Sequence, residues 1–300
     1  MPELPDIELY VERLRERVVG QRLLSFAPYN PFVLRSVTPK PAELADHLTI
    51  GVSRLGKRVV LEFEDELFAV IHLMIAGRLM WKTPLPAEKR SNGKIIVAGF
   101  RFENGQLSLQ EISTKKRASI TLIRGRGALE VLRRAGLDLF SSSVGEFGVR
   151  LREKNRTLKR ALTDPNAFDG IGNAYSDEIL FEARLSPVRL TSSLTDKEVE
   201  HLFEASKSCL ERWRVRMQEL FPKFPQPADV TAFRPDFATH GRYGEPCPVC
   251  GSPIQRIVQA ENETNYCAKC QNEGRLLADR SLSRLLKDDW PKTLEELMAD

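Results

Sequence analysis

The spacing of apolar positions along the chain changes near residue 125. Apolar residues recur every three or four positions from residue 4 to residue 18, which predicts a helix almost at the first residue. Between residues 53 and 112 they alternate with polar residues or form short runs bounded by turn residues, as in β-strands. Strands are expected at 53–63, 67–73, 78–81, 95–102 and 106–112, with a hairpin turn at Asn104-Gly105. Residues 1–125 are therefore predicted to form a mostly β domain with a helix packed on it.

Helical spacing returns in the second half of the chain. A connector with one short helix near 128–135 leads to helical segments at 149–163 and 174–183. A longer helix is expected to begin at the capping box Thr195-Asp-Lys-Glu198 and to end near residue 220, before several prolines. Residues 273–300 resemble a docking helix, with apolar residues at Leu276, Leu277, Leu282, Leu285, Leu286 and Trp290.

The length and composition indicate a globular chain. Three hundred residues suggest about two domains, and 42% hydrophobic with 29% charged residues excludes wholesale disorder. The chain has no apolar run of 18 residues, and its start, Met-Pro-Glu-Leu-Pro-Asp, lacks the basic and apolar regions of a secretory signal. We therefore expect no membrane association and a cytoplasmic location.

The net charge of +4 is small, but the basic residues are clustered. Five lie between residues 115 and 126 without an acidic residue, and five lie between 151 and 160 against a single glutamate. Such clusters fit a polyanion-binding surface, although most charge runs are only solvated faces.

Four of the five cysteines follow the spacing C-x2-C-x16-C-x2-C, namely Cys247, Cys250, Cys267 and Cys270. This spacing is typical of a zinc ribbon, in which four thiolates hold one structural Zn²⁺ and leave no open position for chemistry. Disulfides are the alternative, and the reducing cytosol disfavours them. Cys209 lies in a helical pattern and is expected to be a small buried residue.

A glycine-containing turn precedes the segment at 174–183. Gly170 and Gly172 permit backbone with positive φ, and Asn173 stands where a helix N-cap belongs. A helix start behind such a turn presents free N–H groups to a phosphate. The alternative is that Asn173 only caps its own helix.

Pro2-Glu3 offers chemistry of a different kind. Removal of Met1 would expose a secondary amine at Pro2, which can attack an electrophilic carbon and form an iminium ion. Glu3 beside it could give or take a proton. The alternative is that these residues only reflect the context of the start codon.

Taken in order, these motifs resemble the formamidopyrimidine-DNA glycosylase/endonuclease VIII family of base-excision repair enzymes. The resemblance covers residues 2 to about 272 and rests on six motifs: Met1-Pro-Glu-Leu-Pro-Asp6, Gly56-Lys57, His72-Leu-Met-Ile-Ala-Gly77, Gly170-Ile-Gly-Asn-Ala-Tyr-Ser-Asp-Glu178, Gly241-Arg-Tyr-Gly-Glu-Pro-Cys247 and the four-cysteine ribbon.

The resemblance implies a catalytic set of Pro2, Glu3 and Lys57. Pro2 would attack C1′ of the damaged nucleotide, displace the base and leave a Schiff base. Glu3 would protonate the sugar ring oxygen, and elimination would then cut the strand. Lys57 would contact phosphate beside the lesion, its alternative role being that of an exposed strand lysine.

The resemblance also implies a set of DNA contacts. Met74 and Ile75 would insert into the duplex after base flipping, unless they only pack between two strands. Asn173 would grip another phosphate within a helix–two-turn–helix element, and Lys159 is a weaker candidate of the same kind. The full set of expected DNA contacts is Met74, Ile75, Lys115, Lys116, Arg117, Lys159, Asn173 and Asn262.

Three departures from the family pattern argue against a typical 8-oxoguanine enzyme. Asn262 stands where relatives place the finger arginine, so phosphate binding should weaken unless Arg256 or another cation substitutes. The segment 113–118 keeps its cations and lacks the aromatic wedge of relatives. Residues 214–238 show no glycine- and threonine-rich segment of the kind that caps flipped 8-oxoguanine.

The sequence thus predicts an α+β chain: a β-sandwich-like domain with flanking helices, a helix–two-turn–helix domain and a C-terminal zinc ribbon. The expected boundaries are 1–125 for the catalytic domain, 126–148 for a linker, 149–240 for the DNA-binding domain, 241–272 for the ribbon and 273–300 for an extension. The predicted function is a monomeric bifunctional DNA glycosylase and abasic-site lyase acting on oxidised or ring-opened bases, of bacterial type and nucleoid-associated. The alternative is a damaged-DNA binding protein without base excision.

Overall fold

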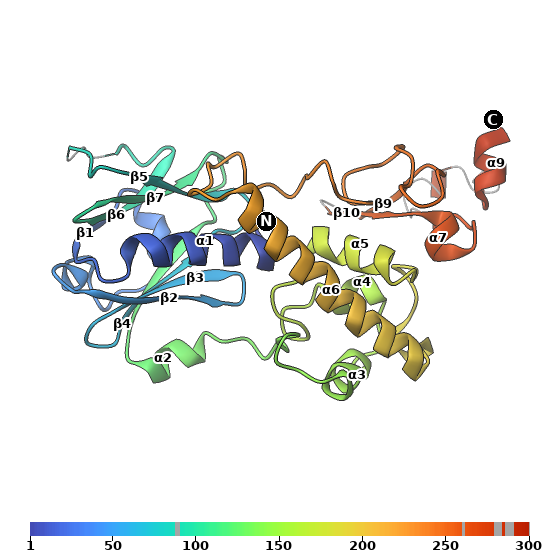
Figure 1. Ribbon diagram of the computed structural model, residues 1–300, viewed down its shortest axis with the longest axis horizontal. Helices are drawn as coiled ribbons and strands as arrows, with labels where there is room; N and C mark the ends of the chain where they lie inside the picture. The colour runs from blue at the N-terminus through green and yellow to red at the C-terminus, as the bar shows by residue number, and fades with distance from the viewer. Residues whose placement is uncertain (88–90, 260–261, 279–283, 286–290, 300) are drawn as a thin grey trace. The chain divides into compact units, whose positions relative to one another are not determined.

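The computed structural model describes residues 1–87, 91–259, 262–278, 284–285 and 291–299 (Figure 1). The chain divides into two compact units. The first unit comprises Met1–Arg134 and Trp213–Thr231, and the second comprises Ala135–Arg212 and Ala232–Asp300. The mixture of sheets and helices agrees with the predicted α+β class.

The first unit contains two four-stranded antiparallel sheets, in the orders β1-β6-β7-β5 and β2-β3-β4-β8. The strands are β1 (Leu23–Pro28), β2 (Thr49–Leu55), β3 (Arg58–Phe63), β4 (Leu67–His72), β5 (Gly77–Lys82), β6 (Ile96–Phe102), β7 (Gly105–Glu111) and β8 (Ser119–Arg124). The helical elements are α1 (Leu4–Val18), α2 (Arg126–Val131) and two short 3-10 turns, Pro31–Val33 and Pro41–Leu44.

The apolar core of this unit draws on both sheets and on α1, which occupies the range expected for the first helix. Alternate residues of a strand point to opposite faces, so Val59 and Leu61 on β3 join this core together with Leu14 of α1. Val60 points the other way, into a smaller cluster that Leu129 of α2 covers. The helix α1 lies along β2 and β3 (Figure 1).

One strand prediction was wrong, and two strands were not predicted. The apolar run at 53–63 is two strands, β2 and β3, that turn back on each other at Gly56-Lys57. The run contains no Pro, Asn or Asp to mark the turn, so Gly56, which adopts φ +65°, is the main local signal for it. The strands β1 and β8 were not predicted, although 119–124 alternates clearly between polar and apolar residues.

The second unit is mostly helical, and its longest helix, α6, contributes its last turns to the first unit. Thr195 and Glu198 form the predicted capping box at its start, and Cys209 is fully buried within it, as expected. The helices are α3 (Val144–Arg152), α4 (Leu158–Leu162), α5 (Asn173–Glu182), α6 (Asp196–Leu220), α7 (Ala268–Asn272), α9 (Leu294–Ala299) and a 3-10 turn, Thr191–Ser193.

The expected single helix at 149–163 was wrong, because it is two helices, α3 and α4, separated by a turn. Leu151 and Leu158 keep a helical spacing across the turn since both are buried. Their periodicity alone therefore could not reveal the break.

The ribbon is the hairpin of β9 (Gln255–Gln259) and β10 (Asn262–Tyr266), followed by α7. Part of the C-terminal extension packs on it: Leu294 is buried against Tyr266 and Ala268, with Leu276 and Leu277 beside them. Leu285 is exposed. The remaining residues of the expected docking helix, Leu282, Leu286 and Trp290, lie outside the described residues.

Among the described residues, no helix combines the length and the apolar character that a membrane span requires.

Candidate active site and nucleic-acid interface

Pro2 and Glu3 are held in place by the start of α1. Glu3 is 3% exposed, and its N–H donates to Asp6 Oδ2 at 2.9 Å while its carbonyl accepts from Ile7 N–H at 2.9 Å. Pro2 is also buried. The first residues of the chain are therefore ordered by the hydrogen bonds that begin the helix.

The amino-terminal amine lies in a buried, charged environment. Burial lowers the pKa of the Met1 ammonium, the carboxylate of Glu3 opposes this shift, and Arg78 and Lys57 reinforce it. A lowered pKa leaves more of the amine neutral, which is the nucleophilic form. The charges of Glu3 and Lys57 therefore both act on the terminal amine, and their catalytic roles stay a prediction.

Arg78 was not singled out from the sequence. It directly follows Gly77 in one of the family-like motifs, and this position was the available signal. Its guanidinium donates to the carbonyl of Ile75 at 3.0 Å and to that of Gly77 at 2.8 Å. Arg78 is therefore hydrogen-bonded to the loop that carries Ile75, and its charge acts on the terminal amine.

Lys57 occupies the tip of the β2–β3 hairpin. Leu55 and Arg58 form the last strand pair, so Gly56-Lys57 is a two-residue turn with glycine at its first, positive-φ position. Arg54 braces the turn by donating to the carbonyl of Gly56 at 3.1 Å. Lys57 is thus fixed at a turn, where the sequence had placed it at the head of a strand.

The loop between β4 and β5 presents an apolar side chain to solvent. The N–H of Gly77 donates to the carbonyl of Leu73 at 2.9 Å, and Met74 adopts a left-handed backbone at φ +54°. Ile75 is 55% exposed at the tip, and Met74 is half-buried. Ile75 is therefore accessible at the tip of the turn, and its insertion into DNA stays a prediction.

The Gly77→Ala variant is expected to disturb this loop. A Cβ at residue 77 would stand 2.3 Å from the carbonyl oxygen of Leu73, so the turn would have to open, at a cost of about 1–3 kcal/mol. Thermal unfolding followed by circular dichroism measures the loss. Gly127→Ala is the matched control, because a Cβ at residue 127 in α2 would meet nothing within 4 Å and alanine favours a helix. Equal melting temperatures for the two variants would contradict the expectation.

The cationic segment 113–118 is organised by a buried carboxylate. Glu111 accepts hydrogen bonds from the backbone N–H groups of Arg117 and Ala118, and Lys116 donates to the carbonyl of Glu111. Lys115 and Arg117 remain exposed. The structure therefore places these two cations at the surface and ties the third to its own loop.

The lowered pKa of His72, at the end of β4, makes the free energy of unfolding depend on pH. Burial, and then the neighbouring cations Arg58, Arg134 and Lys57, lowers its pKa from 6.5 to about 4. As the pH falls below 6.5 the unfolded chain binds this proton first, so the stability contributed by neutral His72 is lost progressively down to about pH 4. We expect the difference in unfolding free energy between the unchanged chain and His72→Gln to shrink as urea melts move from pH 7 to pH 4.5. Parallel pH profiles would contradict this.

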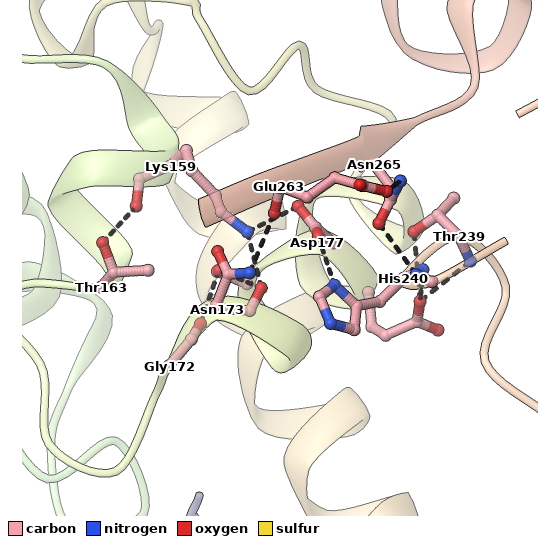
Figure 2. A network of polar contacts seen from close by, with 12 residues as sticks. Lys159, Thr163, Gly172, Asn173, Asp177, Thr239, His240, Glu263 and Asn265 are labelled. Carbon is pink, nitrogen blue, oxygen red and sulfur yellow. Dashed lines mark hydrogen bonds and ion pairs between the residues drawn. The ribbon is translucent and has the colours of Figure 1, made fainter. Parts of the chain in front are cut away.

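In the second unit, the turn before α5 brings Lys159 and Asn173 together (Figure 2). Gly170 has φ +79°, as predicted, whereas Gly172 has φ −131° and is itself the N-cap. The expectation that Asn173 is the N-cap was therefore wrong, since Asn173 is the first residue of the helix. Its side-chain amide donates to the carbonyl of Glu263 on β10 at 2.9 Å.

Lys159 does not extend into solvent. Its side chain is 11% exposed, and its ammonium contacts Asp177 Oδ1 and the carbonyl of Asn173, both at 2.6 Å. A direct phosphate contact by Lys159 stays a prediction. Asp177, which anchors it, was not recognised from the sequence as a separate site residue.

The four ribbon cysteines form a metal-binding cluster, as predicted. All four sulfur atoms lie within 4.8 Å of one another, and the pairs Cys247–Cys270 and Cys250–Cys267 are 3.9 and 3.4 Å apart. Tetrahedral Zn²⁺ with bonds of about 2.3 Å separates its sulfur ligands by about 3.8 Å. The cluster therefore fits one structural Zn²⁺.

The hairpin of the ribbon carries Asn262 at the turn and Arg256 further from the turn, on the opposite strand. Asn262 is exposed at the start of β10. Arg256, on β9, lies over the ring of Tyr243 at 4.2 Å and pairs with Glu263 at 3.4 Å. Arg256 remains the candidate that the sequence analysis named to replace the missing arginine.

Comparison with known proteins agrees with this arrangement. Residues 1–117 match the formamidopyrimidine-DNA glycosylase N-terminal domain, 139–219 match the formamidopyrimidine-DNA glycosylase H2TH domain, and 244–272 match the zinc finger found in FPG and IleRS. The formamidopyrimidine-DNA glycosylase of Desulforamulus reducens is 30% identical over 282 residues, which cover 90% of this chain and 99% of that protein. The chain belongs to the formamidopyrimidine-DNA glycosylase family.

Further members of the family are equally similar over their whole length. The enzyme of that name from Thermus thermophilus is 31% identical over 281 residues, covering 91% of this chain and all of that protein. The solved structure of the Lactococcus lactis enzyme with abasic-site DNA superposes with a TM-score of 0.78 at 25% identity, covering 90% of this chain and 99% of that one. A second Lactococcus lactis structure, with DNA containing a formamidopyrimidine lesion, has the same TM-score at 26% identity.

Proposed function

We propose that the chain removes oxidised or ring-opened bases from DNA through the nitrogen of Pro2, with Glu3 and Lys57 completing the catalytic set. As a member of the formamidopyrimidine-DNA glycosylase family, it is a DNA N-glycosylase of base-excision repair with abasic-site lyase activity. The residue roles given below are our assignment. The observation that supports them is the ordered start of the chain: Pro2 and Glu3 are buried, and the charges of Glu3, Arg78 and Lys57 all act on the amine of the adjacent Met1.

After Met1 is removed, the Pro2 nitrogen attacks C1′ of the damaged nucleotide. The bond from C1′ to the base breaks, and the base leaves with its bonding electrons and takes up a proton. Glu3 protonates the sugar ring oxygen, so the ring opens and an iminium ion joins Pro2 to C1′. Loss of a proton from C2′ then expels the 3′ phosphate and cuts the strand, and water releases the enzyme from C1′.

The remaining residues would hold and distort the DNA. Lys57 contacts the phosphate beside the lesion, and Asn173 contacts another phosphate through its N–H groups at the start of α5. Met74 and Ile75 fill the gap left by the flipped nucleotide, which offsets an unstacking cost of a few kcal/mol. The surface cations Lys115 and Arg117 support binding, together with the ribbon.

We assign the catalytic role to residues 1–125, DNA binding to 149–240 and the ribbon at 241–272, with 126–148 as a linker and 273–300 as an extension. The chain works as a monomer on damaged DNA. Because its substrate is DNA, we place the chain in the cytoplasm of a bacterial-type cell, associated with the nucleoid.

Borohydride trapping tests the assignment of Pro2. The zinc-loaded chain is incubated with duplex DNA containing an abasic site, reduced with borohydride, digested and analysed by mass spectrometry. We expect one stable adduct, located on Pro2 and lost in Pro2→Gly. An adduct on a lysine would remove Pro2 from the mechanism. Tight binding without any adduct would support the alternative, a damaged-DNA binding protein without excision.

A further inference from the structure

The carboxylate of Asp177 lies at the centre of a buried network in the second unit (Figure 2). Its side chain is fully inaccessible on α5. Oδ1 accepts from Lys159 Nζ at 2.6 Å, and Oδ2 lies 2.7 Å from Nδ1 of His240. One carboxylate therefore contacts two elements, 18 and 63 positions away in the sequence.

One arm of the network leads through Lys159 to Asn173, in the turn before α5 that is proposed to bind a phosphate. The ammonium of Lys159 donates to the carbonyl of Asn173 at 2.6 Å, and the Asn173 side chain donates to the carbonyl of Glu263 at 2.9 Å. A side-chain amide has two N–H groups, so this bond leaves Asn173 a further donor. The first residue of α5 is thus fixed to strand β10.

The other arm leads through His240 to the same strand. The neighbouring Gly241 donates its N–H to Asn265 Oδ1 at 2.8 Å, and Asn265 Nδ2 donates to Glu263 Oε1 at 2.7 Å. The two arms meet at Glu263 and close a ring of contacts. Asp177 is the point of the ring from which both arms start.

The carboxylate of Glu178, next to Asp177, holds the backbone that enters the ring. It accepts from the N–H groups of Ala238 at 2.7 Å, Thr239 at 2.9 Å and His240 at 2.9 Å. The segment before the ribbon is therefore bound to α5 by two adjacent acidic side chains.

We propose that Asp177 and His240 are positioning residues that hold the phosphate-binding turn at Asn173 and the ribbon strand β10 in one fixed arrangement. Lys159 acts through Asn173, because its Nζ is bound to Asp177 and to the carbonyl of Asn173 inside the network. The inference rests on the proposed function, because it assumes that Asn173 contacts a DNA phosphate. Asp177, His240 and Lys159 thus contribute to DNA affinity without touching DNA.

The chemistry of the carboxylate explains why asparagine cannot replace Asp177. A carboxylate offers an acceptor to Lys159 and another to His240, whereas an amide has one acceptor and must turn its NH₂ toward one of these partners. In addition, Asp177→Asn leaves the buried ammonium of Lys159 without a counter-charge. The substitution therefore breaks the ring with almost no change in side-chain volume.

The test measures DNA affinity over a series of salt concentrations, using the full-length, zinc-loaded chain and duplex DNA that carries a tetrahydrofuran abasic-site analogue. We expect Asp177→Asn, His240→Phe and Lys159→Met each to weaken binding by about tenfold. The slope of log affinity against log salt should stay unchanged in all three. For Asp177→Asn and His240→Phe, the rate of borohydride trapping on true abasic DNA at saturating protein should stay within about twofold of the rate of the unchanged chain.

Lys197→Met is the matched control for charge, since Lys197 is exposed near the start of α6. It should leave both the affinity and the zinc content unchanged. If Lys159→Met instead lowers the salt slope by about 0.9, Lys159 contacts a phosphate directly and the inference is overturned.

Unchanged affinity in both Asp177→Asn and His240→Phe would also overturn the inference, even with a lower melting temperature, because the network would then be only structural. If Asp177→Asn fails to fold, His240→Phe decides, since phenylalanine keeps the aromatic contacts with Phe233 and Phe237 and removes only the ring nitrogens. An unchanged chain that neither binds nor traps DNA would contradict the proposed function instead.

Discussion

The Glu3→Gln variant is expected to excise damaged bases about 10²–10⁴ times more slowly than the unchanged chain, the range that general acid catalysis contributes. Glutamine keeps the size of the side chain and cannot deliver a proton to the sugar ring oxygen. Glu3 is 3% exposed and its backbone N–H is bound to Asp6, so the replaced side chain would stay at the same position. Single-turnover cleavage of lesion-containing duplex measures the loss.

Strand cleavage at a preformed abasic site should be affected much less by Glu3→Gln. The base has already left such a site, and part of its sugar is present as the open aldehyde that an amine can attack directly. Glu16→Gln is the matched control, because it makes the same change on the outer part of α1, where the Glu16 side chain is 48% exposed. Full excision by Glu3→Gln would assign the acid to another residue.

The Cys267→Ser variant is expected to lose zinc, and with it most DNA affinity. Cys267 is fully buried, and its sulfur lies 3.4 Å from that of Cys250. Binding of structural zinc supplies about 10–16 kcal/mol in small zinc domains, so an incomplete ligand set should leave the ribbon unfolded. Strand β10 would then no longer be available to the Asn173 side chain, which donates to its Glu263 carbonyl. Metal analysis, limited proteolysis and duplex binding measure the three losses.

Cys209→Ser is the control that separates the loss of a metal ligand from the loss of any buried cysteine. Cys209 is equally buried, but it lies in α6 and outside the metal cluster. We expect this variant to retain one zinc ion per chain and to bind DNA normally, with only a lower melting temperature. A Cys267→Ser protein that keeps both zinc and affinity would mean that the ribbon neither needs the metal nor contributes to binding.

Sequence patterns were sufficient to predict the features that depend on residues close to one another in the sequence. The helix at 4–18 and the four-cysteine cluster were both predicted, because helical spacing and knuckle spacing each depend on neighbouring residues. The capping box at Thr195 and Glu198 is another case, since its two hydrogen bonds span three residues.

Predictions were wrong where a regular pattern runs through a turn. The buried spacing of 149–163 continues across the break between α3 and α4, and the run at 53–63 passes through the β2–β3 hairpin with only Gly56 to mark the turn. In both places the tertiary structure, and not the local periodicity, decides where an element ends. Strand β8 was hidden for a different reason, because its short alternation lies within a cluster of basic residues that resembles a binding loop.

The network around Asp177 could not be predicted from spacing. Asp177 and His240 are 63 positions apart, and a charged residue with a histidine is most simply interpreted as part of a solvated surface. Their pairing depends on how the segment 237–241 returns to α5. Only the folded chain shows that the expected phosphate-binding lysine, Lys159, is held inside this network.

The packing of Leu294 on the ribbon has a consequence for truncated forms of the chain. A nonsense mutation shortly after residue 272 keeps all four cysteines but removes Leu294, Leu276 and Leu277. Tyr266 and Ala268 would then stay uncovered in a protein that has every metal ligand in place, so such a chain is expected to aggregate.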